Sequence, residues 1–148
     1  MTPLPQITLS IPSCLEHVQL LGHAVESICR HSRLSPSEAH DVELCVVEAA
    51  NNSIEHAYRN EPMHTVVVTV DIQPKTLILE IIDSGYPANT SEIQRDRTQL
   101  LDFDPADLDA IPERGRGLAI IQKLMDSVEY IAGAEWNRLR LTKRLDVH

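Results

Sequence analysis

The stretch TVVVTVDIQPKTLILEIID, residues 65–83, decides the fold of this chain. Two runs within it, Thr65–Ile72 and Thr76–Asp83, are rich in β-branched residues with a period of two, which is typical of strands. Only Gln73–Lys75 separates the runs, and so short a connection favours a hairpin. In a doubly wound parallel sheet, strands would alternate with helices throughout. The hairpin therefore predicts a mixed, mostly antiparallel sheet.

The chain that precedes this hairpin predicts one strand and two helices. Residues 6–11 alternate apolar and polar side chains, which indicates a short first strand. An amphipathic pattern over about residues 14–31 indicates a helix, with Ser13 as its N-cap. The run SPSE, residues 35–38, places Pro at a first helical position and Glu in a first turn. A second helix is therefore predicted to start there and to run to about residue 59.

The chain that follows the hairpin predicts a long loop, a third helix and a second hairpin. Residues 86–114 have little periodicity, and so long a loop in a compact domain is typical of a functional lid or of a disordered stretch. Residues 118–128 have a helical pattern, and residues 128–132 and 139–145 predict a closing hairpin. The whole predicts an α+β two-layer sandwich with helices on one face of the sheet, formed as a single domain by residues 1–148.

Composition argues against several classes of function. The chain has 13 Lys and Arg against 22 Asp and Glu, and its net charge of −9 argues against binding a nucleic-acid backbone. No apolar run reaches the ~20 residues that span a bilayer, and the first residues lack a signal pattern, so we expect a cytoplasmic protein without membrane contact. The three cysteines, Cys14, Cys29 and Cys45, are an odd number and widely spaced, which fits neither a set of disulfides nor a CxxC metal site. We therefore expect them to be free and buried.

The second predicted helix carries a polar stripe beside its apolar face. Glu48, Asn52 and His56 stand four residues apart, and a step of four residues turns a helix only about 40° past a full turn. The three side chains are therefore expected on one stripe at the edge of the core. Taken alone, this stripe favours a solvated helix flank with an incidental carboxylate.

Two glycine motifs follow, each at a junction between predicted elements. Asp83–Ser84–Gly85 ends a strand, where a carboxylate can accept a hydrogen bond from an exocyclic amine such as that of adenine, and glycine lets a flat base approach the backbone. Arg114–Gly115–Arg116–Gly117–Leu118 leads into the third helix, where free N–H groups and the helix dipole favour an anion. Taken singly, the two motifs are also compatible with a simple turn and a flexible loop.

In this order and at these junctions, the three motifs resemble those of the GHKL superfamily of ATPases, named for gyrase, a heat-shock chaperone, histidine kinases and a mismatch-repair protein. Residues 48–56 match its N box, residues 83–85 its first glycine box and residues 115–117 its second. A single box would be a weak signal, whereas the ordered set is specific.

Within that superfamily, the chain is similar to the anti-sigma-factor serine kinases of bacterial partner switching. The similarity rests on VVEAANNSIEHAY (46–58), DPADL (104–108) and ERGRGLAIIQKLMDSVEY (113–130). It extends from about residue 6 to residue 145, which is nearly the whole chain.

The resemblance implies roles for the residues of the first two motifs. Glu48 matches the general base, which takes the proton from an attacking serine hydroxyl. Asn52 matches the residue that holds Mg²⁺ while the ion bridges the phosphates of ATP. Asp83 is expected to bind the adenine amine and Gly85 to flank the base, while His56 is expected to line the pocket near the lid.

The third motif is implied to bind the phosphates. Gly115 and Gly117 are expected to cradle them through backbone N–H groups at the helix start, which continues into Leu118. Arg114 is the first candidate for the γ-phosphate contact, and Arg116 is the second.

The chain departs from the family pattern just before its last predicted strand. Many relatives have a Gly-Thr pair there, whose hydroxyl helps to bind adenine, whereas this chain has Trp136 and Asn137. Asn137 is the candidate to replace that hydroxyl contact.

The implied function is an anti-sigma factor that is also a serine protein kinase. It would use ATP and Mg²⁺ to phosphorylate a serine of an anti-anti-sigma antagonist, bind a sigma factor, and form a homodimer. The acidic net charge is compatible with docking to a basic sigma-factor surface. The alternative is a nucleotide-dependent binding module with little or no kinase activity. The presence of Glu48 favours the enzyme. The altered Trp136–Asn137 stretch leaves the binding module as an open alternative.

Overall fold

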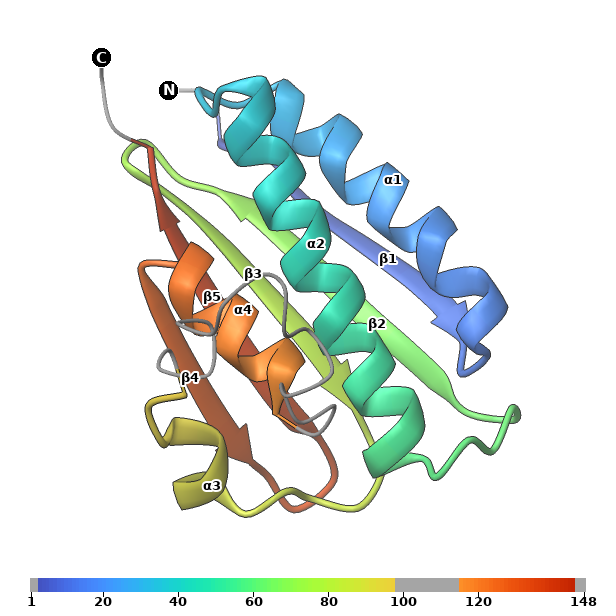
Figure 1. The fold of residues 1–148 in the computed structure, drawn as a ribbon. Coiled ribbons are helices and arrows are strands. Elements are labelled where there is room, and N and C mark those ends of the chain that lie inside the picture. Colours follow the sequence, from blue (N-terminus) through green and yellow to red (C-terminus); the bar gives the residue numbers. More distant parts are fainter. Residues whose placement is uncertain (1–2, 98–114, 146–148) are drawn as a thin grey trace, which may run out of the picture.

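A five-stranded sheet forms one layer of the protein. The computed structural model describes residues 3–97 and 115–145, and Figure 1 shows the sheet behind a layer of helices. The strand order is β1-β2-β3-β5-β4, and every pairing among these strands is antiparallel. The prediction of an α+β sandwich is confirmed. The sequence predicts a mixed and mostly antiparallel sheet, and in the described residues the sheet is wholly antiparallel. The strands are β1 (Gln6–Pro12), β2 (Thr65–Ile72), β3 (Thr76–Asp83), β4 (Ser127–Ala132) and β5 (Asn137–Arg144).

The hairpin of β2 and β3 has the bounds that the sequence predicts. Val67 pairs with Ile82, and the Gln73 N–H donates to the Thr76 carbonyl at 2.9 Å to close the turn. β3 then pairs with β5 on its other side, so β3 is the central strand of the sheet. The polar groups at the end of β3 are consequently surrounded by other elements.

Three longer helices cover one face of the sheet, as Figure 1 shows. The short helix α3 packs instead beside β4, at the end of the sheet where β3 finishes. The helices are α1 (Val18–Arg30), α2 (Pro36–Asn52), α3 (Thr90–Gln94) and α4 (Arg116–Leu124).

The start of α2 is a complete capping box, as the SPSE run predicts. The Glu38 N–H donates to Ser35 Oγ at 3.1 Å, and the Ser35 N–H donates to Glu38 Oε1 at 3.0 Å. Pro36 occupies the first helical position, where its missing N–H costs nothing.

The first helix differs from the prediction at its start. It begins as a 3-10 turn over Leu15–His17 before α1, and Ser13 does not cap it. Ser13 Oγ instead donates to the Glu61 carbonyl and accepts from the His64 N–H at 3.1 Å. The hydroxyl of Ser13 thus serves a connection to the loop before β2, a partner too distant in sequence for a local pattern to indicate.

The second helix is regular only to Asn52. It continues as a π-helical turn over Ser53–Ala57, so the predicted helix to about residue 59 changes its geometry inside the polar stripe. The third predicted helix also shifts, because α4 begins at Arg116, and Ser127 already belongs to β4.

The predicted lid, residues 86–114, contains one helix in its described part. Asn89 caps α3, because its Oδ1 accepts from the N–H groups of Ser91 at 3.0 Å and Glu92 at 3.3 Å. Residues 98–114, which include Arg114 and the DPADL run, lie outside the described residues.

The core is aliphatic and lies between the sheet and the helices. Cys29 and Cys45 are buried in it, and burial raises the pKa of each thiol to about 12, so both act as small apolar side chains. Cys14 is only half-buried, so the prediction of three buried cysteines is wrong for that residue. No helix among the described residues is long and apolar enough to cross a bilayer. Fully buried core side chains include Val42, Val46, Ile54, Val66, Val68, Leu77, Leu79, Ile81, Ile121 and Leu141.

Candidate functional site

A cavity of about 750 Å³ lies where β3 ends between α2, α3 and α4. Its wall brings together residues from all three predicted motifs, among them Asn52, Asp83 and Gly115. The predicted residues His56 and Leu118 also lie on this wall. The other lining residues include Ser53, Arg59, Tyr86, Glu92, Ile93, Arg97 and Tyr130.

Asp83 is held at the end of β3 by three hydrogen-bond donors. Its side chain accepts from Ser53 Oγ at 3.0 Å on one oxygen, and from Asn137 Nδ2 at 2.9 Å and the Gly85 N–H at 3.1 Å on the other. The residue is only 7 % exposed, and these donors offset the cost of burying a carboxylate. Asp83 is therefore fixed in one orientation on the cavity wall.

Asn137 is the residue that the sequence offers in place of the hydroxyl of the resembled family. It lies opposite Asp83 in the register of β3 and β5, and its Nδ2 group donates to both Asp83 Oδ1 and the Gly85 carbonyl at 3.0 Å. With 4 % exposure it is as enclosed as Asp83. The structure thus places an amide donor beside the carboxylate, whereas the Trp136 side chain is about half exposed.

Gly85 fits against the π-helical turn that follows α2. The Tyr86 N–H donates to the Ala57 carbonyl at 2.9 Å, which brings the two backbones together. A Cβ at Gly85 would lie 2.4 Å from the Ala57 oxygen and 2.6 Å from its carbonyl carbon. Any side chain here would force two backbone segments apart, so glycine is required for this packing.

Gly85→Ala is therefore expected to destabilise the fold by about 1–3 kcal/mol, the usual range for overpacking. Urea denaturation of both proteins measures the change in the free energy of unfolding. Gly22→Ala is the matched control, because the atom nearest its Cβ would be a side-chain methyl, Val47 Cγ2 at 2.7 Å, rather than backbone, and alanine favours a helix. Equal stability losses in the two variants would contradict this explanation of Gly85.

Glu48 lies one turn before Asn52 and packs against the start of α4. A Cβ at Gly117 would lie 2.6 Å from Glu48 Oε2, so this glycine leaves room for the carboxylate. The pKa of Glu48 is raised, first because burial disfavours its charge and also because Glu55 is nearby, while Arg116 opposes the shift. Among the described residues, Glu48, Gly85, Arg116 and Gly117 are adjacent to the cavity rather than on its wall.

The start of α4 has the geometry of an anion site. Gly115 has a φ of +93°, a left-handed conformation that favours glycine, and its carbonyl accepts from the Ala119 N–H at 3.0 Å as the first helical bond. The N–H groups of the first turn have no carbonyl partner within the helix and carry the positive end of its dipole. Arg116 begins this helix, and Arg114 lies outside the described residues.

Sequence reasoning missed the residues that support this site. Ser53 and Tyr58 both lie within the VVEAANNSIEHAY run, yet nothing in that run distinguishes them from ordinary helix residues. Tyr58 is buried, and its hydroxyl donates to the Thr65 carbonyl at 2.6 Å and accepts from the Ser84 N–H at 2.8 Å. It thereby fixes the turn that follows Asp83.

Two further aromatic residues on the wall were also missed. The Arg59 guanidinium lies 3.9 Å from the centre of the Tyr86 ring, in cation–π contact. The Tyr130 hydroxyl accepts from the Ala88 N–H at 2.9 Å, and burial is the main cause that raises the pKa of Tyr130. These contacts attach the chain after β3 to the turn that follows the π-helical segment on one side and to β4 on the other.

A separate polar group lies at the 3-10 turn before α1. The ligand atoms of Cys14, Glu16 and His17 lie within 4.8 Å of one another. The group joins a thiol, a carboxylate and an imidazole that lie within four consecutive residues. Glu16 is exposed and Cys14 and His17 are half-buried, so the group is open to solvent.

Most of the chain matches one family of known proteins. The family model described as "Histidine kinase-like ATPase domain" matches residues 11–143. Among curated proteins, the chain is 30 % identical over 141 residues to the "Anti-sigma F factor" of Oceanobacillus iheyensis, covering 95 % of this chain and 92 % of that protein. It is 26 % identical over 129 residues to the "Serine-protein kinase RsbW" of Bacillus velezensis, covering 86 % and 79 %.

Two solved bacterial structures have the same fold as this chain. The RsbU and RsbW domains of Rv1364c from Mycobacterium tuberculosis match with a TM-score of 0.66 at 16 % identity, over 97 % of this chain and 33 % of that one. This chain thus spans about a third of that solved chain. The SiaB–SiaC complex from Pseudomonas aeruginosa matches with a TM-score of 0.62 at 18 % identity, over 92 % and 88 %. At these identities the two structures show a shared fold.

Proposed function

The chain belongs to the histidine kinase-like ATPase domain family, and we propose that it is an anti-sigma factor with serine protein kinase activity. In this proposal it uses ATP and Mg²⁺ to phosphorylate a serine of an anti-anti-sigma antagonist. The observation that carries the proposal is one cavity wall that holds the oriented Asp83 carboxylate, Asn52 and the start of α4. Relatives named as an anti-sigma factor and as a serine-protein kinase support it.

The geometry suits a nucleotide that lies across the cavity. Asp83 would accept a hydrogen bond from the exocyclic amine of adenine. Each carboxylate oxygen can accept more than one bond, so the three protein donors leave a lone pair free for this contact. Gly115 and Gly117 would cradle the phosphates through backbone N–H groups at the start of α4. Base and phosphates would thus bind to two elements on one wall.

Asn52 is the residue proposed to hold Mg²⁺. Its half-buried side chain lies on the cavity wall, and within the described ranges its amide makes no hydrogen bond that would compete with a ligand. A neutral amide oxygen suits a hard cation without adding repulsion toward ATP, and Mg²⁺ usually completes its shell with phosphates and water. The bound ion would neutralise charge that develops on the phosphates.

Asn52→Ala is expected to remove the gain in ATP affinity that Mg²⁺ provides, a loss of about tenfold or more. Titration calorimetry with and without Mg²⁺ measures it, and the variant should bind ATP about equally in both. Asn51→Ala is the control, since the neighbouring asparagine has the same chemistry but is not on the described wall. A variant that keeps the full Mg²⁺ effect would contradict the assignment.

Glu48 is proposed as the general base. Its carboxylate lies beside Gly117, next to the proposed phosphate site, and its raised pKa makes it a better proton acceptor than an ordinary Glu. Arg116 lies close enough to affect that pKa, so it would add positive charge on the phosphate side. Glu48 would take the serine proton as the hydroxyl oxygen attacks the γ-phosphate.

The direct test is phosphorylation of candidate antagonist proteins by the purified chain with ATP and Mg²⁺. Phosphoserine on an antagonist is the expected product. The proposal includes a sigma factor as second partner, consistent with the acidic charge of −9, and a cytoplasmic homodimer in which residues 1–148 act as a single domain.

The second candidate is a nucleotide-dependent binding module without phosphoryl transfer. Asn137 keeps it open, because an amide donor to Asp83 Oδ1 is found where the resemblance implies a hydroxyl. This module would bind ATP and a partner and yield no phosphoserine, so the same experiment separates the two candidates.

A further inference from the structure

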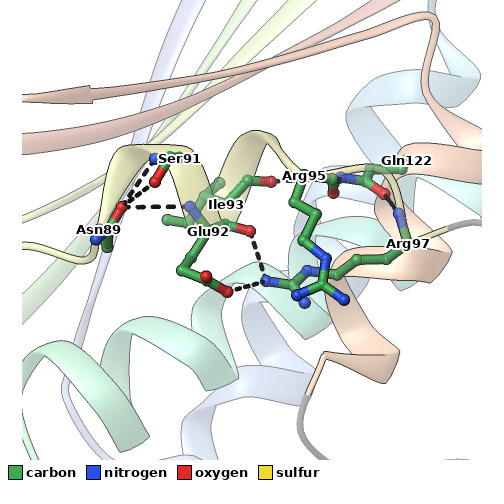
Figure 2. Close-up of polar contacts among 7 residues, drawn as sticks. All are labelled: Asn89, Ser91, Glu92, Ile93, Arg95, Arg97 and Gln122. Carbon is green, nitrogen blue, oxygen red and sulfur yellow. Dashed lines mark hydrogen bonds and ion pairs between the residues drawn. The ribbon is translucent and has the colours of Figure 1, made fainter.

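Arg97 is a cavity-wall residue to which no motif gives a role. It follows α3, and its side chain is only 15 % exposed. An arginine this enclosed is unusual unless the guanidinium has a fixed set of partners. Its contacts, shown in Figure 2, indicate what it is placed to bind.

Gln122 on α4 holds the segment that carries Arg97. Gln122 Oε1 accepts from the Arg97 N–H at 2.7 Å, and Gln122 Nε2 donates to the carbonyls of Arg95 at 2.7 Å and Ile93 at 3.3 Å. Figure 2 shows these contacts together on one side of the segment. A single amide thus attaches the chain after α3 to α4, the helix whose start is the proposed phosphate site.

The Arg97 guanidinium extends over that start. A Cβ at Gly115 would lie 3.2 Å from Arg97 Nη1 and 3.6 Å from its Cδ, so the side chain covers the glycine. Nη2 donates to the Glu92 carbonyl and lies 3.5 Å from Glu92 Oε2, a carboxylate on a side chain that is 60 % exposed. Nε is buried and has no hydrogen-bond partner in the described part of the chain.

We propose that Arg97 binds the phosphates of the nucleotide directly, and that Gln122 is its positioning residue. The proposal rests on the proposed function, to which it adds a residue outside the three motifs. Arginine matches phosphate oxygens with a planar set of donors, and a nucleotide is a stronger partner than one exposed carboxylate. The positive end of α4 and the guanidinium would then act on the same anion.

Arg97→Ala tests this with two ligands, ATP and adenosine, measured by competition against a fluorescent ATP analogue. ATP affinity should fall about 10- to 100-fold, the effect of lost hydrogen bonds to a charged group. Adenosine affinity should not change, because adenosine has no phosphate. Arg95→Ala is the matched control, since Arg95 lies on the same segment, is exposed, and is not part of the described wall. It should leave both affinities unchanged.

Gln122→Met tests the positioning role. The substitution keeps side-chain length but removes the three hydrogen bonds, so ATP affinity should fall while Arg97 is present. In the Arg97→Ala background it should cause no further loss, whereas a merely structural role would add its own cost. Melting temperatures of all variants show whether each one is folded.

Two results would overturn the proposal: unchanged ATP affinity in folded Arg97→Ala, or equal losses for ATP and adenosine. The first leaves the proposed function intact if the wild-type protein binds ATP and Asp83→Asn weakens that binding. Failure of the wild-type protein to bind ATP would overturn both proposals together.

Discussion

Glu48→Gln is expected to slow phosphoryl transfer to the antagonist by about 10²–10⁴-fold, the usual cost of removing a general base. Glutamine keeps the size of the side chain beside Gly117 but cannot accept the serine proton. ATP affinity should barely change, because the carboxylate is not proposed to contact the ground-state phosphates. Steady-state transfer of labelled phosphate, with calorimetry for ATP, separates rate from binding. Transfer at the wild-type rate would falsify the catalytic role.

The same variant has a pH signature. Glu48 must be deprotonated to act as a base, and burial holds its pKa above the ordinary value. The transfer rate should therefore fall with decreasing pH as the pH passes through this raised pKa, and the remaining rate of Glu48→Gln should lack that dependence. Glu55→Gln is the control: Glu55 raises the pKa of Glu48, so its loss should move the midpoint to lower pH and keep the plateau. An unmoved midpoint would contradict the coupling.

Asp83→Asn is expected to weaken ATP binding by about 10- to 100-fold, which corresponds to the ~1.5–3 kcal/mol of a hydrogen bond to a charged group. An amide has one oxygen in place of two, so it cannot serve Ser53, Asn137 and the adenine amine together. The loss should be the same with and without Mg²⁺, unlike that of Asn52→Ala. Titration calorimetry under both conditions gives this comparison.

Asp71→Asn is the control for that variant. Asp71 also accepts from a side-chain amide, that of Gln73 at 2.9 Å, but it lies on β2 and is not part of the described cavity wall. It should leave ATP affinity unchanged. Unaltered binding in Asp83→Asn would mean that the base does not bind at the end of β3, and the assignment of the cavity would be lost with it.

The polar stripe on α2 shows how far a local pattern reaches. The sequence places Glu48, Asn52 and His56 on one stripe, and the structure puts Asn52 and His56 on the cavity wall. The π-helical turn after Asn52 is not visible in the pattern, because apolar spacing alone does not distinguish an α from a π turn. That turn brings Ser53 to Asp83 and Ala57 to Gly85.

The sequence by itself determines the elements whose cause is local. The β2–β3 hairpin follows from β-branched residues around a short turn, and the start of α2 follows from the Ser35–Glu38 capping box. The positions of the glycine motifs at the ends of their elements also follow from local sequence. These features depend on residues within a few positions of one another, so spacing is enough to predict them.

Only the tertiary structure decided which of these elements meet. The contact of Asp83 with Asn137 spans 54 residues of chain, and Glu48 lies against Gly117 from a different helix. The placement of Arg97 over Gly115 depends on a hydrogen bond from its backbone to Gln122, 25 residues away. Strand pairing and helix packing bury the core, and they also bury the polar groups at the end of β3. These groups are stable there only when they form hydrogen bonds with residues that the packing places beside them.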